Sequence, residues 1–214
     1  LNLSADNFNL PEILTHIGHS EKLLVMRVFI AALVLIFSLQ SWAKADDIRD
    51  FQIEGMSIGD SLLDYFTVDK IEKIKSLNKK IKYARVFIED DLQIYEYVQV
   101  WVLDKDKDYK IEAISGEIDF ENNITGCRKK QKEITEDIKN SIFNLSIDEN
   151  VTKNMHDKTG KSKTYHSVLE FPNGDFVNIQ CYKYSKNMNL TDHLKVMIGL
   201  KKLNDHYLEV KNNP

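Results

Sequence analysis

The sequence predicts an α+β protein whose helices pack on one face of an antiparallel sheet. Several segments of about eight residues alternate hydrophobic and polar side chains, which is typical of strands with one buried face. One long segment between two groups of such strands repeats its hydrophobic residues with the helical period. The composition, 43% hydrophobic and 29% charged, is that of a globular protein. The expected order is α-α-β-β-β-α-β-β-β, a tandem pseudo-repeat of helix followed by three strands.

The first two predicted helices cover residues 57–66 and 67–77. Ser57-Ile58-Gly59-Asp60 has the spacing of a capping box, in which a hydroxyl and an acid three residues later satisfy backbone N–H groups at the start of a helix. The apolar residues that follow on one face are Leu62, Leu63 and Phe66. Thr67 can cap the second helix, whose apolar residues are Ile71, Ile74 and Leu77.

Three strands are predicted at 81–88, 94–103 and 109–120, because apolar side chains alternate along each segment. The charged run from Asp104 to Asp108 separates the last two strands. A short polar connection of this kind predicts an antiparallel hairpin.

A longer helix is predicted at 124–143. Its apolar residues fall on one stripe opposite a charged face, and they are Cys127, Ile134, Ile138 and Ile142. The polar segment 144–161 that follows is long for a connection in a compact domain. It is either a mobile loop or the carrier of a short element that the pattern does not identify.

Three further strands are predicted at 164–171, 175–184 and 193–200, again from alternation. Pro172-Asn173-Gly174 favours a tight turn between the first two. The closing segment 203–210 fits either a strand or a helix.

Alternation places small and β-branched side chains of these strands on a core face that the helices cover. The opposite face carries aromatic and amide side chains, and its candidate binding residues are Tyr83, Arg85, Tyr95, Tyr97, Trp101, Gln180 and Tyr182. Flat rings give contact area at little entropic cost, so this face can bind a peptide, a glycan or an envelope protein. Alternatively, the long loop, the C-terminal segment or a second subunit buries it, or its cross-strand pairs only stabilise the sheet.

The two cysteines fall on elements that are expected to face each other. Cys127 lies on the apolar stripe of the helix at 124–143, and Cys181 lies on the core face of the strand at 175–184. This placement favours a disulfide between helix and sheet in an oxidising compartment, and the alternative is two buried free thiols. The missing C-x-x-C spacing argues against a redox-active pair.

The first 45 residues are expected to precede the working domain. Met26-Arg27 begins a segment with a basic start, an apolar stretch over 28–39 and small residues at Ala43 and Ala45, which predicts a cleaved signal peptide at 26–45. Residues 1–25 read as a non-native upstream extension. We therefore expect one periplasmic domain at 46–214 with no membrane segment after cleavage. The alternative is an uncleaved N-terminal membrane anchor.

Gly59-Asp60-Ser61-Leu62 matches the nucleophile block of the GDSL esterases. The downstream blocks that supply the remaining catalytic groups of those enzymes are missing from this sequence. The leading prediction is therefore a non-catalytic binding or envelope-interaction protein, and no catalytic residue is assigned. A small periplasmic hydrolase centred on Ser61 is the alternative.

Other motif-like strings do not predict a cofactor or a metal. Thr159-Gly160-Lys161-Ser162 resembles the end of a P-loop, but Met155 stands where the first glycine is needed. Asp104, Asp106 and Asp108 have the spacing of an EF-hand start, but Tyr109 replaces its glycine. The net charge of −4 and the excess of Lys over Arg argue against a nucleic-acid partner.

A family of short exported proteins from marine planktonic alphaproteobacteria is similar to this chain over four strings: FQIEGMSIGDSLLDYF (51–66), YKIEAISGEIDFENNITGCRKKQKEI (109–134), TGKSKTYHSVLEFPNGDFVNIQCYKY (159–184) and DHLKVMIGLKKLNDHYL (192–208). This resemblance implies an exported, single-domain protein and no particular activity. More loosely, the Gly55-Met56-Ser57 entry to the predicted helical hairpin resembles envelope proteins of the outer-membrane assembly-lipoprotein and beta-lactamase-inhibitor-protein type. The lipobox cysteine of those lipoproteins is missing here.

Overall fold

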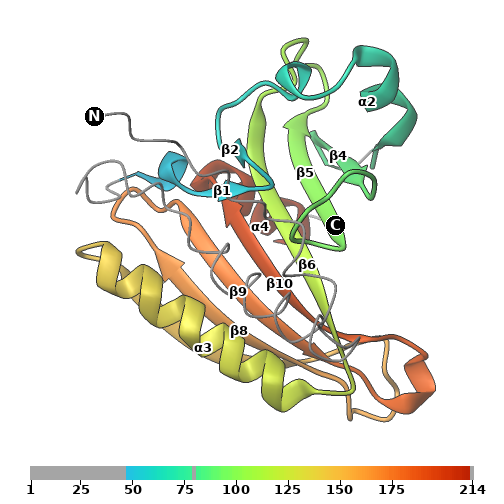
Figure 1. Cartoon of the computed structure of the whole chain (residues 1–214), viewed down its shortest axis with the longest axis vertical. Helices are drawn as coiled ribbons and strands as arrows, with labels where there is room; N and C mark the ends of the chain where they lie inside the picture. Colours follow the sequence, from blue (N-terminus) through green and yellow to red (C-terminus); the bar gives the residue numbers. More distant parts are fainter. Residues whose placement is uncertain (1–46, 79–80, 213–214) are drawn as a thin grey trace, which may run out of the picture. The chain divides into compact units, whose positions relative to one another are not determined.

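The computed structural model describes residues 47–78 and 81–212, which all belong to one compact unit, Trp42–Pro214. The predicted upstream extension and the predicted signal peptide, with Ala43 and Ala45, lie outside the described residues. Within them the α+β class is confirmed, because α-helices accompany an eight-stranded antiparallel sheet (Figure 1).

The large sheet has the strand order β3-β4-β5-β6-β10-β9-β8-β7. Neighbouring strands are all antiparallel, and β6 and β10 form the central pair. Each of the six predicted strands overlaps an observed one. The strands are β3 (Lys75–Ser76), β4 (Tyr83–Ile88), β5 (Tyr97–Leu103), β6 (Ile111–Glu121), β7 (Ser146–Lys153), β8 (Lys163–Glu170), β9 (Phe176–Lys183) and β10 (Asp192–Gly199).

The sequence did not decide the secondary structure of two segments, and the structure shows a strand in one and a helix in the other. The first half of segment 144–161 forms β7, an edge strand in which all eight residues are exposed. Because neither face of β7 is buried, its sequence shows no clear alternation of hydrophobic and polar residues. The C-terminal segment forms a helix, α4 (Lys201–Asn212).

The predicted helix at 57–66 is wrong. This region forms the hairpin β1 (Gln52–Ile53) and β2 (Met56–Ser57), followed by the single 3₁₀ turn η3 (Leu62–Asp64). Gly59 has φ +91°, and its N–H donates to the Ile111 carbonyl while the Ile111 N–H donates to the Asp60 carbonyl. The Asp60 carboxylate does accept from the Ser57 N–H, but this bond closes a turn tied to β6 instead of a helix.

The second predicted helix is present in a shorter form, α2 (Val68–Ile74). The Thr67 hydroxyl accepts from the Lys70 N–H, so Thr67 is the cap that the sequence predicts. The segment that was expected to continue the helix instead pairs with β4 as the short edge strand β3.

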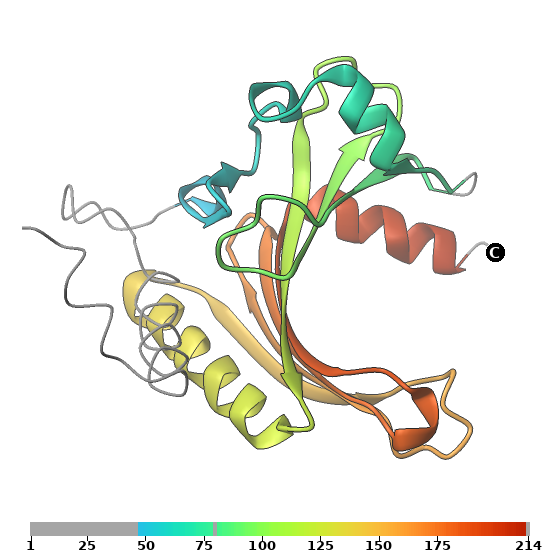
Figure 2. The same cartoon turned by 45° about the vertical axis from the view of Figure 1, so that its right-hand side comes forward.

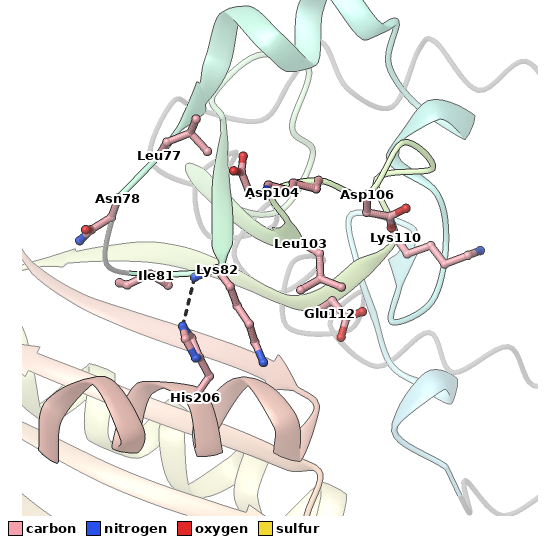
Figure 3. A pocket seen from close by; sticks show the side chains of 11 residues that line it. Leu77, Asn78, Ile81, Lys82, Leu103, Asp104, Asp106, Lys110, Glu112 and His206 are labelled. Carbon is pink, nitrogen blue, oxygen red and sulfur yellow. Dashed lines mark hydrogen bonds between the residues drawn. The ribbon is translucent and has the colours of Figure 1, made fainter. Parts of the chain in front are cut away.

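α4 packs on one face of the sheet, here called the α4 face, and the sheet curls toward this side (Figure 2). Tyr83, Trp101, Ala113 and Leu203 form its buried cluster. The Lys82 N–H donates to His206 Nε2 at 3.1 Å, which fixes α4 to the start of β4 (Figure 3). The expected packing of the predicted helices on one face did not include this C-terminal helix, because the sequence left residues 203–210 open between strand and helix.

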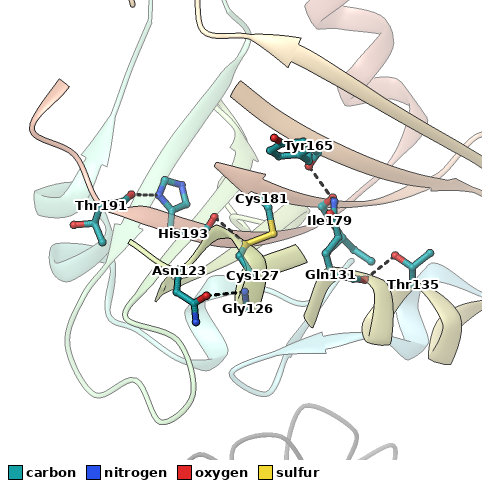
Figure 4. The surroundings of a disulfide bond; sticks show 10 residues. All are labelled: Asn123, Gly126, Cys127, Gln131, Thr135, Tyr165, Ile179, Cys181, Thr191 and His193. Carbon is teal, nitrogen blue, oxygen red and sulfur yellow. Dashed lines mark hydrogen bonds between the residues drawn. A yellow bond between two sulfur atoms is a disulfide. The ribbon is translucent and has the colours of Figure 1, made fainter. Parts of the chain in front are cut away.

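On the opposite face, here called the α3 face, α3 (Ile124–Ser141) packs against β6, β8, β9 and β10, as the sequence predicts for a helix on the sheet. The predicted disulfide is confirmed: Cys127 of α3 is joined to Cys181 of β9, with a Cα–Cα distance of 5.9 Å (Figure 4). Gln131 Nε2 donates to the backbone carbonyls of Ile179 and Tyr165, which adds a polar attachment. The predicted core side chains that are buried here are Ala84, Val86, Ile88, Val98, Val100, Val102, Ile114, Val177 and Ile179.

Candidate functional site

Two of the seven candidate binding residues are buried by α4. Tyr83 is 2% exposed and Trp101 is 5% exposed. The Trp101 Nε1–H donates to the Tyr207 hydroxyl at 3.1 Å, and the Tyr83 ring meets His206 edge to face at 5.6 Å. These two residues therefore attach the C-terminal helix to the sheet and offer no surface to a partner.

Tyr95 lies on the other side of the sheet. It precedes β5, and its ring occupies the space where a side chain at Gly116 would stand, 2.3 Å from an ideal Cβ. Gly116 pairs with Val98 and Val196, whose buried side chains belong to the α3 face. Expecting Tyr95 on the aromatic face was wrong, because the backbone before β5 does not continue the alternation of the strand.

The remaining part of the α4 face holds five half-buried side chains in contact, here called the Glu117 surface: Tyr97, Glu117, Tyr182, His193 and Lys195. Lys195 Nζ lies 2.9 Å from Glu117 Oε1, and His193 Nε2 lies 3.8 Å from Glu117 Oε2. The His193 ring stacks on Tyr182 with centroids 4.5 Å apart and an interplanar angle of 24°. Tyr97 is the cross-strand partner of Glu117.

The tyrosines of this surface keep their protons at neutral pH. Burial, followed by the charge of Glu117, raises the pKa of Tyr97 to about 12. Burial also raises the pKa of Tyr182, and the neighbouring Tyr184 and Glu117 add to that shift. Each hydroxyl therefore keeps its proton and adds no charge to the surface.

A chain of side-chain hydrogen bonds continues this surface toward β7. The Tyr182 hydroxyl donates to Gln180 Oε1 at 2.9 Å, and Gln180 Nε2 lies 3.1 Å from His166 Nδ1. His166 Nε2 lies 2.9 Å from the Thr152 hydroxyl. Burial lowers the pKa of His166, so its imidazole is neutral and accepts from Gln180 while it donates to Thr152. This chain orients Gln180 and Tyr182.

Arg85 lies toward the other end of the face. Its guanidinium lies over the Phe87 ring at 5.5 Å, and Phe87 contacts Tyr97 with ring centroids 5.9 Å apart. Phe87 and Tyr97 thus connect Arg85 to the Glu117 surface. The structure brings together Arg85, Tyr97, Gln180 and Tyr182 of the seven candidates. It adds Glu117, His193 and Lys195, which an aromatic pattern alone does not single out.

The Ser61 hydroxyl has a structural role. It donates to the Asp108 carbonyl and accepts from the Leu63 N–H at the start of η3. The neighbouring Asp60 carboxylate accepts from Tyr65 and from the Ser57 N–H. Within residues 47–78 and 81–212, no histidine is hydrogen-bonded to Ser61. Both hydrogen bonds of the Ser61 hydroxyl are thus made to backbone groups, one of them at the start of η3.

The other motif-like strings form loops with their own hydrogen bonds. Asp157 accepts from the hydroxyls and N–H groups of Ser162 and Thr159, which orders the segment that resembles a P-loop end. Asp106 accepts from the N–H groups of Asp108 and Lys110 in the β5–β6 turn. In the part of the chain that the structure describes, no three His, Cys, Asp or Glu side chains gather as a metal site would require.

None of the described helices has both the length and the apolar character needed to cross a membrane. Comparison of the chain with protein-family models, with curated proteins and with solved structures finds no match.

Proposed function

We propose that this protein is an exported, non-catalytic binding module that holds a segment of a partner polypeptide on the Glu117 surface. The observation that carries the proposal is the half-buried cluster of Tyr97, Tyr182 and His193 around the Glu117–Lys195 ion pair. Tyrosines are enriched in the energetically dominant parts of protein interfaces.

The chemistry of the surface favours a polypeptide partner. The protonated Tyr97 hydroxyl is a donor for a backbone carbonyl, and the rings of Tyr97 and Tyr182 give apolar contact to side chains. The hydrogen-bonded chain through Gln180 and His166 holds Tyr182 before a partner arrives, so little side-chain entropy is lost on binding. The curl of the sheet toward this side offers a curved contact surface (Figure 2).

Export is part of the same proposal. The signal-peptide pattern at 26–45 supports it, and the Cys127–Cys181 disulfide is of the kind that persists in an oxidising compartment.

We also propose that the fold descends from two tandem units. The meander β4-β5-β6 and the meander β8-β9-β10 lie on the two sides of the β6–β10 pair, and this order supports that reading.

Photo-crosslinking in cells that make the whole chain tests the proposed surface. Benzoylphenylalanine replaces Tyr97 in one variant and Tyr182 in a second. In a matched control it replaces Lys132, which is exposed on α3. We expect the first two positions to give the same discrete protein adduct by mass spectrometry, since they flank one surface. The control position should not give it.

The proposal fails if positions 97 and 182 give no protein adduct, or if position 132 gives the same adduct with similar yield. Retention of the unmodified protein on a glycan array, without any protein adduct, would assign the surface to a carbohydrate instead. Cooperative thermal unfolding of each variant shows that the fold is retained.

A further inference from the structure

A separate hollow of about 950 Å³ lies between the start of β4, the β5–β6 hairpin and α4 (Figure 3). Its wall includes the apolar side chains of Ile81 and Leu103 together with His206. None of the five residues of the Glu117 surface lines it. The inference below therefore does not depend on the proposed function.

Glu112 is the unusual member of this wall. It is the extra residue of a β-bulge, because Trp101 pairs with Ala113 while Val102 pairs with Ile111. A bulge redirects one side chain out of the alternation of its strand. The Glu112 side chain consequently lines the hollow while Glu112 remains only 6% exposed.

The Glu112 carboxylate has one cationic neighbour among the residues that the structure describes. Lys202 Nζ of α4 lies 2.5 Å from Oε2, but the Lys202 side chain itself is 54% exposed. No hydrogen bond of normal geometry reaches Oε2 from residues 47–78 or 81–212. A buried carboxylate usually accepts several hydrogen bonds, since leaving its lone pairs unused is costly. Glu112 therefore has capacity for a further donor.

The charges of the described residues in this wall do not exclude a cation. Lys82, Lys105 and Lys110 line the hollow, and Asp104, Asp106 and Glu112 balance them. Asp106 is already occupied by backbone N–H groups of its own turn. His206 accepts from the Lys82 N–H through Nε2, so its ring adds no acceptor at that atom. Asp104 is only half-buried, so Glu112 is the buried carboxylate of this wall, and its charge repels a ligand carboxylate.

We propose that this hollow binds a small aliphatic amine. The ammonium group takes the place of Lys202 Nζ at the Glu112 carboxylate, and the carbon chain lies against Leu103 and Ile81. Lys202 then acts as an internal competitor, because it neutralises Glu112 in the free protein and returns to solvent when the amine binds. Its partly exposed side chain makes this exchange inexpensive.

Three probes with the same carbon chain test the proposal on protein purified from cells expressing the whole chain: 1-pentylamine, 1-pentanol and pentanoate. Titration followed in amide NMR spectra should show saturable shifts with pentylamine only, and these should include the signal of Glu112. Glu112→Gln should weaken pentylamine binding at least tenfold. Lys202→Met should tighten it several-fold, since the competing ammonium is gone. The matched control Lys201→Met should not change it, because Lys201 pairs with Asp205.

Equal binding of pentanoate or pentanol would overturn the assignment to a cation. Absence of saturable pentylamine binding would overturn the site itself, as would wild-type affinity in Glu112→Gln. If Glu112→Gln does not fold, Lys202→Met still decides the matter, because unchanged or weaker affinity in that variant contradicts the competition.

Discussion

The position of the large Tyr95 side chain depends on the absence of a side chain at Gly116. The Tyr95 ring lies where a Cβ at position 116 would stand, so the glycine opens a slot on the α3 face for the tyrosine. The slot also explains why Tyr95 is only 8% exposed although it precedes β5. Burial raises the pKa of the Tyr95 hydroxyl above its ordinary value, so this hydroxyl stays protonated.

We predict that Gly116→Ala destabilises the protein by about 1–3 kcal/mol, because an added methyl group overpacks the site against the Tyr95 ring. Urea unfolding measures the change. In a Tyr95→Ala background the same substitution should cost much less, since the clash is removed. Equal costs in the two backgrounds would show that the ring is not the obstacle.

Glu54 is a second residue whose role depends on the tertiary structure. It lies in the β1–β2 turn with φ +51°, and its carboxylate accepts from the N–H groups of Gln93, Ile94 and Tyr95. These bonds hold the irregular segment before β5 against the first hairpin. Nothing in the local sequence around Glu54 indicates this partnership, because the partners are about 40 residues away.

Asp157 gives the protein a predictable response to acid. Hydrogen bonds from Ser162 and Thr159 hold the pKa of its carboxyl below the ordinary value of an aspartate. A group with a lowered folded-state pKa contributes stability above its unfolded-state pKa of about 4, and this contribution is lost as the pH falls through the folded-state value.

We therefore predict that Asp157→Asn is less stable than the wild type at pH 7 and that the difference shrinks as the pH falls below about 4. Thermal unfolding at a series of pH values measures it. The exposed Asp119 offers a control, since Asp119→Asn should leave stability close to that of the wild type. A difference that grows toward low pH would contradict the assigned sign.

At the scale of elements, the sequence predicts best where an element has one buried face. The helix at 124–143 and the strands that carry β-branched residues were predicted for this reason, and so were the two positions of the disulfide. β7 was not assigned, because all its residues are exposed and its pairing with β8 depends on the neighbouring chain. The helix at 57–66 failed because Gly59 and Asp60 bond to Ile111, a contact that no local pattern reveals.

The disulfide joins the two elements that cover and form the α3 face. Cys127 and Cys181 are 54 positions apart in the sequence, so the bond constrains a long loop of the unfolded chain. We predict that Cys127→Ala with Cys181→Ala lowers the free energy of unfolding by about 4 kcal/mol in the chain-entropy account. Urea unfolding of the double variant measures the loss.

The wild-type protein under reducing conditions is the control for that measurement. It should lose a similar amount, while the double variant should not respond to reductant. A loss well below 1 kcal/mol in both would mean that packing of α3 on the sheet, and not the cross-link, determines stability at this face.

At the scale of the whole unit, the main difference between prediction and structure concerns the aromatic face. The sequence placed seven residues on it, but α4 buries Tyr83 and Trp101 and the backbone turns Tyr95 to the other side. Alternation identifies which residues share a face, yet it cannot show which later segment covers that face. What remains open is smaller than predicted and more highly charged at its centre, around Glu117 and Lys195.

The disulfide and the signal-peptide pattern together predict one cellular outcome. If the segment at 26–45 directs export and is cleaved, protein made from the whole chain in a Gram-negative host should begin at Asp46 and contain no free thiol. Mass spectrometry after thiol alkylation measures both properties. Ala43→Arg should block cleavage, because the peptidase requires a small residue at that position, whereas the matched Ala43→Ser should not. Recovery of an uncleaved wild-type chain with two reactive thiols would contradict export. The disulfide would then lack the oxidising compartment in which such bonds form.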